Sequence, residues 1–123
     1  MEIFDKGIKE KITRILVQIG IPANLQGFGY FRECIYFVVK EPTILKSVTK
    51  VLYPQVGEIF HVNGSAVERC MRHASEVAYD KTKFKKINDL FGISGNESAC
   101  YKPTNSEIIA LVAEFLRMEL VDA

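Results

Sequence analysis

Six polar or charged side chains between residues 65 and 76 recur at the spacing of one helix face. At about 100° per residue they point away from an apolar stripe on the same segment. They supply hydrogen-bond donors and acceptors on a helix whose neighbouring side chains are small: Ser65, Glu68, Arg69, Arg72, His73 and Glu76. A helix with one packing face and one such polar face can lie in the major groove of DNA. The pattern therefore predicts a recognition helix over residues 65–79.

The opposite side of this helix and its beginning are also readable from the residue types. The apolar stripe consists of Val67, Met71, Ala74 and Ala78, flanked by Cys70 and Val77. Asn63 and Gly64 tolerate positive φ and indicate a turn. We expect Ser65 to begin a capping box, in which its hydroxyl accepts from the N–H three residues on and Glu68 reaches back to the Ser65 N–H.

Residues 54–61 predict a shorter helix that completes a helix-turn-helix over about residues 54–79. Pro54 suits a first turn, because its missing N–H has no partner there in any case. Gly57 has no side chain, so we expect the second helix to cross closely over it, with Val62 and Val67 filling the angle. A three- or four-residue connection containing Gly is typical of this motif, although His61 stands where many such turns have Gly. The alternative is a helical protein-interaction module with a solvated polar face and no direct base readout.

Composition limits the classes of function. The chain has 123 residues, 48% of them hydrophobic and 25% charged, which suits one soluble domain with one core. The net charge of +1 gives no global sign of a nucleic-acid partner. Residues 65–86, however, hold six basic side chains against three acidic ones. The basic residues are Arg69, Arg72, Lys81, Lys83, Lys85 and Lys86, and the lysines either touch phosphates or simply cover a solvated face.

Other chemistry has weaker support. Three widely spaced cysteines without a C-x-x-C pair argue against a disulfide framework and fit a reducing cytosol. Cys70 and His73 have metal-ligand spacing, but the periodicity turns one inward and the other outward, so we expect no metal or other cofactor. No Cys, His and carboxylate share a predicted concave face, so we expect no catalytic residues and no enzyme. No apolar run is long enough to span a membrane, and we expect no membrane partner.

The remaining segments predict an all-α domain. Residues 2–19 form an amphipathic helix closed by Gly20 and Pro22, and residues 29–40 form a second helix, for which a buried strand is the alternative. Thr43 caps a third helix, over residues 43–53. Residues 84–91 form a short helix that Gly92 closes, and residues 92–103 form a loop. Thr104 and Glu107 form a capping box that opens a last helix through about Glu119.

Several runs of residues together resemble a known family. They are Ile-Gly-Ile-Pro-Ala at 19–23, the 27–35 segment, Lys-Val-Leu-Tyr-Pro at 50–54, Val-Glu-Arg-x-x-Arg-His-Ala at 67–74 and Lys-Pro-Thr-Asn-Ser-Glu at 102–107. In these runs the chain resembles the DNA-binding effector domain of the sporulation master response regulator, stage-zero sporulation protein A of endospore-forming bacteria. The resemblance extends from about residue 8 to residue 120.

The resemblance implies a compact bundle of about six helices that normally follows a phosphoacceptor receiver domain. In that two-component system, phosphorylation promotes dimerisation, and the effector domain binds boxes like TGTCGAA to activate or repress sporulation genes. It also implies dimeric or tandem binding on double-stranded DNA, contact with an RNA polymerase sigma subunit, and a location in the bacterial cytoplasm at the nucleoid. The chain lacks a receiver-like strand–helix alternation with an acidic pocket, so we expect the effector domain alone.

The resemblance also implies DNA-contact roles for the individual residues that match the family's motifs. Glu68 and Arg69 match the family's base-reading pair; an arginine can donate two bonds to guanine and a glutamate can accept one from cytosine. The resemblance places Ser65, Arg72 and His73 at DNA phosphates. From the residues themselves we expect Asn63, Lys83 and Lys86 to make secondary DNA contacts. Ala66 departs from the family, which often has Arg there. The 81–101 segment resembles the transcription-activating region too weakly to assign sigma contacts.

Overall fold

All elements of the described residues are helical. The computed structural model describes residues 3–82, 84 and 102–122, of which the side chains of 3, 4, 121 and 122 are not discussed. Its helices are α1 (Ile3–Gln18), α2 (Gln26–Lys40), α3 (Tyr53–Phe60), α4 (Gly64–Thr82) and α6 (Asn105–Asp122), with a 3₁₀ segment (Pro42–Ser47) and a π turn (Val48–Leu52) before α3. The all-α prediction is confirmed for this part of the chain, and the strand alternative for residues 34–39 is wrong because α2 runs through them.

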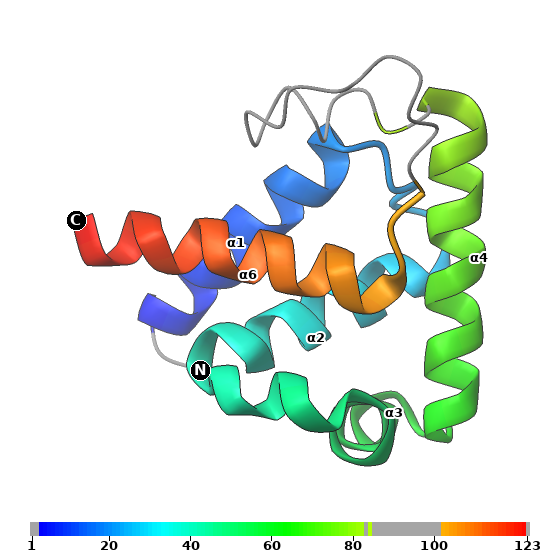
Figure 1. The fold of residues 1–123 in the computed structure, drawn as a ribbon, viewed down its shortest axis with the longest axis horizontal. Helices are drawn as coiled ribbons and strands as arrows, with labels where there is room; N and C mark the ends of the chain where they lie inside the picture. Colours follow the sequence, from blue (N-terminus) through cyan, green and yellow to red (C-terminus); the bar gives the residue numbers. More distant parts are fainter. Residues whose placement is uncertain (1–2, 83, 85–101, 123) are drawn as a thin grey trace.

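Helix α2 lies at the centre of the fold. It packs against α1, α4 and α6, and its Phe31, Cys34 and Ile35 side chains are fully buried. Helix α4 stands along one side of the molecule, across the direction of α6, and α3 lies at its N-terminal end (Figure 1). This arrangement buries one face of α4 against α2 and leaves the opposite face along the outside of the bundle.

The first and last helices follow the predicted patterns. In α1 the stripe Ile8, Ile12, Ile15 and Leu16 is buried, and Ile19 just beyond it is buried as well. The chain then turns at Gly20, whose φ is +96°. At the start of α6 the predicted capping box is present: the Thr104 N–H donates to Glu107 Oε1 at 2.8 Å, and the Glu107 N–H donates to Thr104 Oγ1 at 3.2 Å. Helix α6 continues to Asp122, three residues beyond the predicted end.

The predicted α-helix over residues 43–53 is wrong. This stretch is a 3₁₀ segment followed by a π turn, and Thr43 does not cap it, because the residue before the segment is Glu41 and no side chain caps it. Pro54 offers a reason for the π turn. Since Pro54 has no N–H, an α-helical bond to the carbonyl four residues earlier is impossible. Wider bonds form instead, such as the one from the Tyr53 N–H to the Val48 carbonyl.

Two further expectations concern other parts of the chain. Helix α2 begins at Gln26, three residues earlier than predicted, which brings Gly27 into the helix. The predicted helix over 84–91 and most of the predicted 92–103 loop lie outside the described residues, apart from Phe84, Lys102 and Pro103. Among the helices that are described, none is long and apolar enough to cross a membrane.

Candidate nucleic-acid interface

A three-residue turn joins α3 to α4. His61 ends α3 with φ at +61°, in the left-handed region, and the Val62 N–H donates to the Gly57 carbonyl at 2.9 Å. A Cβ on Gly57 would overlap the Val62 carbonyl oxygen. The predicted close approach at Gly57 is therefore real, but the turn makes it rather than the body of the second helix. His61 adopts the conformation for which this turn usually has Gly.

The capping prediction for α4 was wrong by two residues. The cap is Asn63, whose Oδ1 accepts from the Ala66 N–H at 2.8 Å. Helix α4 already begins at Gly64, so Ser65 lies inside the first turn and Glu68 does not reach back to it. Asn63 and Ser65 are both good capping residues, and the position of the turn after α3 decides between them. Ser65 is consequently an exposed side chain without a structural role in the described part of the chain.

The buried stripe of α4 agrees with the prediction. Val67, Met71, Ala74 and Ala78 are all fully buried, whereas Val62 keeps 36% of its surface exposed and fills the angle only in part. At Gly27 the start of α2 approaches α4 closely: a Cβ there would lie 2.8 Å from the Ala74 Cβ. This close packing settles which side of α4 faces outward.

The predicted site residues divide into two groups on the outward side. Ser65, Arg69 and His73 are exposed, and their side chains make no hydrogen bond or ion pair to any described residue. Glu68 and Arg72, by contrast, form an ion pair one helix turn apart, with 36% and 52% of their side-chain surfaces exposed. The structure thus brings the five residues onto one helix, but it leaves Arg69 free and engages Glu68.

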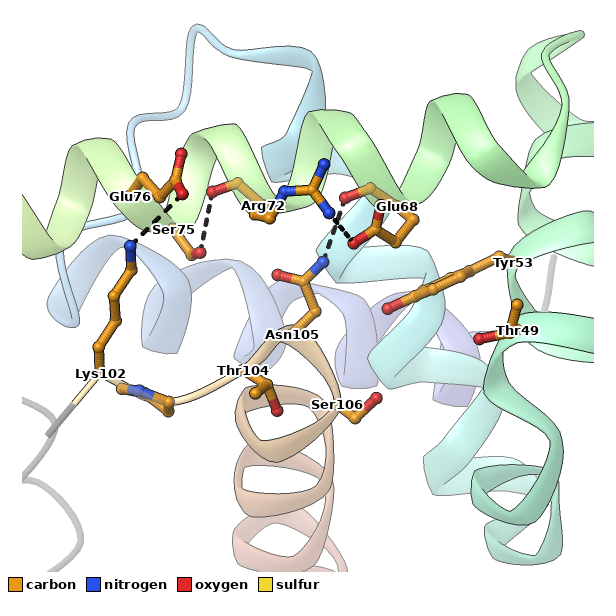
Figure 2. Close-up of a pocket in the computed structure, with 11 residues that line it drawn as sticks. Thr49, Tyr53, Glu68, Arg72, Ser75, Glu76, Lys102, Thr104, Asn105 and Ser106 are labelled. Carbon is orange, nitrogen blue, oxygen red and sulfur yellow. Dashed lines mark hydrogen bonds and ion pairs between the residues drawn. The ribbon is translucent and has the colours of Figure 1, made fainter.

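A pocket of about 360 Å³, whose lining residues are mostly of polar types, adjoins the Glu68 side of α4. Its walls come from α4, from the segment before α3 and from the start of α6 (Figure 2). Lys102 lies 3.4 Å from Glu76 and over the Tyr79 ring, so it adds a positive charge beside the polar face. Asn105 points from α6 toward α4 and donates from Nδ2 to the Glu68 carbonyl at 3.2 Å. Sequence reasoning missed both residues.

The structure gives no support to a metal site in the part it describes. No group of three or more His, Cys, Asp and Glu side chains lies there in a metal-binding arrangement. Cys70 is half-buried with its thiol 3.8 Å from Gln26 Oε1, while His73 is exposed. Cys70 thus lies nearer the packed side of α4 than His73 does, although the two are only three residues apart.

Comparison with known families now decides the class of the protein. The family model described as "Sporulation initiation factor Spo0A C terminal" matches residues 12–116. The chain belongs to this family. It is accordingly a C-terminal domain of the Spo0A type, the DNA-binding, transcription-regulating domain of the sporulation response regulator, and the family is a regulatory one rather than a family of enzymes.

Within this Spo0A C-terminal domain, the structure describes only one of the three predicted secondary contacts. Asn63 is exposed at the N-terminus of α4, with its side-chain oxygen used as the cap. Lys83 and Lys86 lie outside the described residues. Ala66, the departure from the family pattern, is half-buried on the first turn of α4.

Proposed function

We propose that this domain reads TGTCGAA-like boxes in double-stranded DNA by placing α4 in the major groove. In this proposal α3, the turn and α4 act as a helix-turn-helix over about residues 54–79, with α4 as the recognition helix. The observation that supports it most is the exposure of the Arg69 side chain. Its guanidinium is exposed, opposite the buried stripe of α4, and makes no ion pair within the described residues. An arginine presented in this way is free to make a bidentate contact with guanine.

Glu68 would act as the second base reader by accepting a hydrogen bond from cytosine. In the free domain its carboxylate pairs with Arg72. DNA offers Arg72 a phosphate in place of this carboxylate, and an exposed pair of this kind is worth less than about 1 kcal/mol. The exchange would therefore cost little, and it would release Glu68 as the phosphate contact forms. Ser65 and His73, which are exposed on the same helix, would contact phosphates and set the register.

Charge near α4 supports attraction to DNA although the whole chain is nearly neutral. Arg69, Arg72 and Lys102 lie on or beside the outward face of α4, with Glu68 and Glu76 as their acidic neighbours. In our proposal Asn63, Lys83 and Lys86 extend the contact to phosphates on either side. Such contacts position the domain and make its affinity dependent on salt.

The wider assembly follows as part of the same proposal. The whole chain would be one effector domain that acts under a receiver domain, binds adjacent boxes as a dimer or in tandem, and contacts an RNA polymerase sigma subunit. Adjacent boxes on DNA would bring two such domains together, since each box orients one α4. Dimeric binding predicts a steeper binding curve on a duplex with two boxes than on a duplex with one.

The direct test is fluorescence anisotropy with a TGTCGAA duplex and a scrambled duplex, at low and near-physiological salt. Arg69→Ala should remove about 1–3 kcal/mol of the preference for the box. Arg117→Ala is the matched control, because Arg117 is also exposed but lies on the half of α6 that points away from α4 (Figure 1). Equal binding of both duplexes by the wild type, or an unchanged preference in Arg69→Ala, would contradict the recognition-helix assignment.

The alternative of a protein-interaction module has one observation in its favour. A groove between α1, α2 and α3 is lined in part by apolar side chains, and Val17 at its edge is 56% exposed. A partner bound there would lose little affinity with added salt, whereas a DNA reader loses affinity steeply. The same salt series therefore separates the two candidates.

A further inference from the structure

Asn105 is a buried polar residue at the point where three elements meet. It retains 8% of its surface exposure and begins α6. Its Nδ2 donates to the Glu68 carbonyl of α4 at 3.2 Å. The buried phenol of Tyr53, at the start of α3, points toward Asn105 and Ser106 (Figure 2). Burial raises the pKa of the Tyr53 phenol, and the nearby Asn105 and Ser106 side chains counter part of that rise.

Fold stability alone does not explain an asparagine at this place. Its Oδ1 is buried and has no hydrogen-bond partner among the residues that the structure describes, and an unsatisfied buried acceptor costs free energy. The Glu68 carbonyl lies inside α4, where the helix itself supplies a donor four residues on. The bond from Asn105 is therefore a second bond to a carbonyl that would not be left unpaired without it.

What the bond does provide is a fixed position for one turn of α4. That turn carries both Glu68 and Arg69, the two residues to which the proposed function gives base contacts. Helix α4 is also held at Cys70 and Ala74, where Gly27 packs closely against it. The buried stripe of Val67, Met71, Ala74 and Ala78 already fixes the inward face of α4. The bond at Glu68 adds a directional attachment to α6 beside this stripe, which limits rotation of the turn that carries the base readers.

We propose that Asn105 is a positioning residue for base recognition: its bond to the Glu68 carbonyl fixes the turn of α4 from which Glu68 and Arg69 reach DNA. This inference rests on the proposed function and names a further residue on which its specificity depends. Binding sites must hold contacting groups to within about 0.5 Å. Asn105 should therefore affect discrimination between sequences and leave sequence-independent attraction to phosphates unchanged.

Two variants of neighbouring residues separate positioning from stability. In Asn105→Ala the bond to Glu68 and the unsatisfied oxygen disappear together, so the melting temperature should change little. The ratio of dissociation constants for scrambled and TGTCGAA duplexes should fall by about two- to tenfold, the loss expected for one neutral hydrogen bond. Binding to the scrambled duplex and its salt dependence should stay as in the wild type.

Thr104→Ala is the control with the opposite behaviour. It removes the side-chain cap that Thr104 gives to the Glu107 N–H, so it should lower the melting temperature. It leaves the Asn105 bond in place and should keep the wild-type ratio. Asn105→Ser, which retains a short polar side chain that falls short of Glu68, should behave like Asn105→Ala.

The possible results distinguish a failure of the positioning role of Asn105 from a failure of the proposed function. An unchanged ratio in Asn105→Ala, an equal fall of the ratio in Thr104→Ala, or an Asn105→Ala chain that no longer folds would each overturn the positioning role. If the wild-type domain itself does not prefer TGTCGAA to the scrambled duplex, the proposed function fails and the inference fails with it. The wild-type measurement is therefore made first.

Discussion

The contact between α2 and α4 at Gly27 allows a quantitative test of the packing that orients α4. In Gly27→Ala the new Cβ would lie 2.8 Å from the Ala74 Cβ and 2.9 Å from the Cys70 carbonyl carbon. Carbon atoms in contact normally stay about 3.5–4.0 Å apart. The obstructing atoms belong to the backbone and to a Cβ, which cannot rotate away. The two helices would have to separate by roughly 1 Å, the difference between these distances.

The expected cost follows from two opposing effects. Overpacking of a well-packed core costs about 1–3 kcal/mol. Alanine favours a helix over glycine by up to about 1 kcal/mol, and less at the second residue of α2, where Gly27 lies. We therefore expect the free energy of unfolding to fall by about 1–2 kcal/mol. For a domain of this size, that is a fall in melting temperature of roughly 3–10 °C.

Urea and thermal unfolding would measure the change, with Gly7→Ala as the matched control. Gly7 lies inside α1, and a Cβ there meets no atom within 4 Å. The same substitution should therefore stabilise the domain at Gly7, by about 0.5–1 kcal/mol. An unchanged urea m-value would show that both changes alter stability without altering the surface exposed on unfolding. If Gly27→Ala is as stable as the wild type while Gly7→Ala is stabilised, the close approach of α2 to α4 is refuted.

Three further predictions concern the turn, the polar face and the core. His61→Gly should stabilise the domain by about 0.5–1 kcal/mol in urea unfolding, because glycine adopts the left-handed φ of +61° without the strain of a Cβ; a loss of stability would contradict this. Glu76→Gln should tighten binding to box and scrambled duplexes alike and steepen the salt dependence, since it frees Lys102 from its ion pair; anisotropy that shows unchanged affinity would argue against Lys102 lying near phosphates. Burial, and to a lesser degree the Glu33 charge, raises the pKa of the Cys34 thiol. Cys34 should therefore stay unmodified by a thiol reagent at pH 8 in the folded domain and react only after unfolding. Labelling of Cys34 in the folded domain, detected by mass spectrometry of its peptide, would contradict this prediction.

Helical periodicity predicted most of the described fold because it depends on local geometry. The stripes of α1 and α4 recur every three to four residues, and each proved to be the buried face of its helix. The Thr104 and Glu107 capping box was equally predictable, since both partners lie within one helix turn. Local patterns failed where proline changed the bonding, as in the π turn that precedes Pro54.

At the start of α4 the sequence predicted the wrong cap, because it indicated Ser65 as the cap and Asn63 only as a turn residue. Asn63 and Ser65 can both cap a helix, and the residue that does so depends on where the preceding turn ends. The bond from Val62 to Gly57 sets that end, so Asn63 becomes the cap and Ser65 is left exposed. Glu68, which the capping box would have used, instead forms the ion pair with Arg72.

The sequence by itself determined the helical class, the family and the residues that share the outward face of α4. These depend on residue types and on spacings within a few positions. Tertiary structure alone decided how that face is held and which of its groups are free. The approach of Gly27 to Cys70 and the bond from Asn105 to Glu68 join residues about 40 positions apart. Such contacts exist only once the helices have packed, because no periodic pattern in one helix specifies its neighbour.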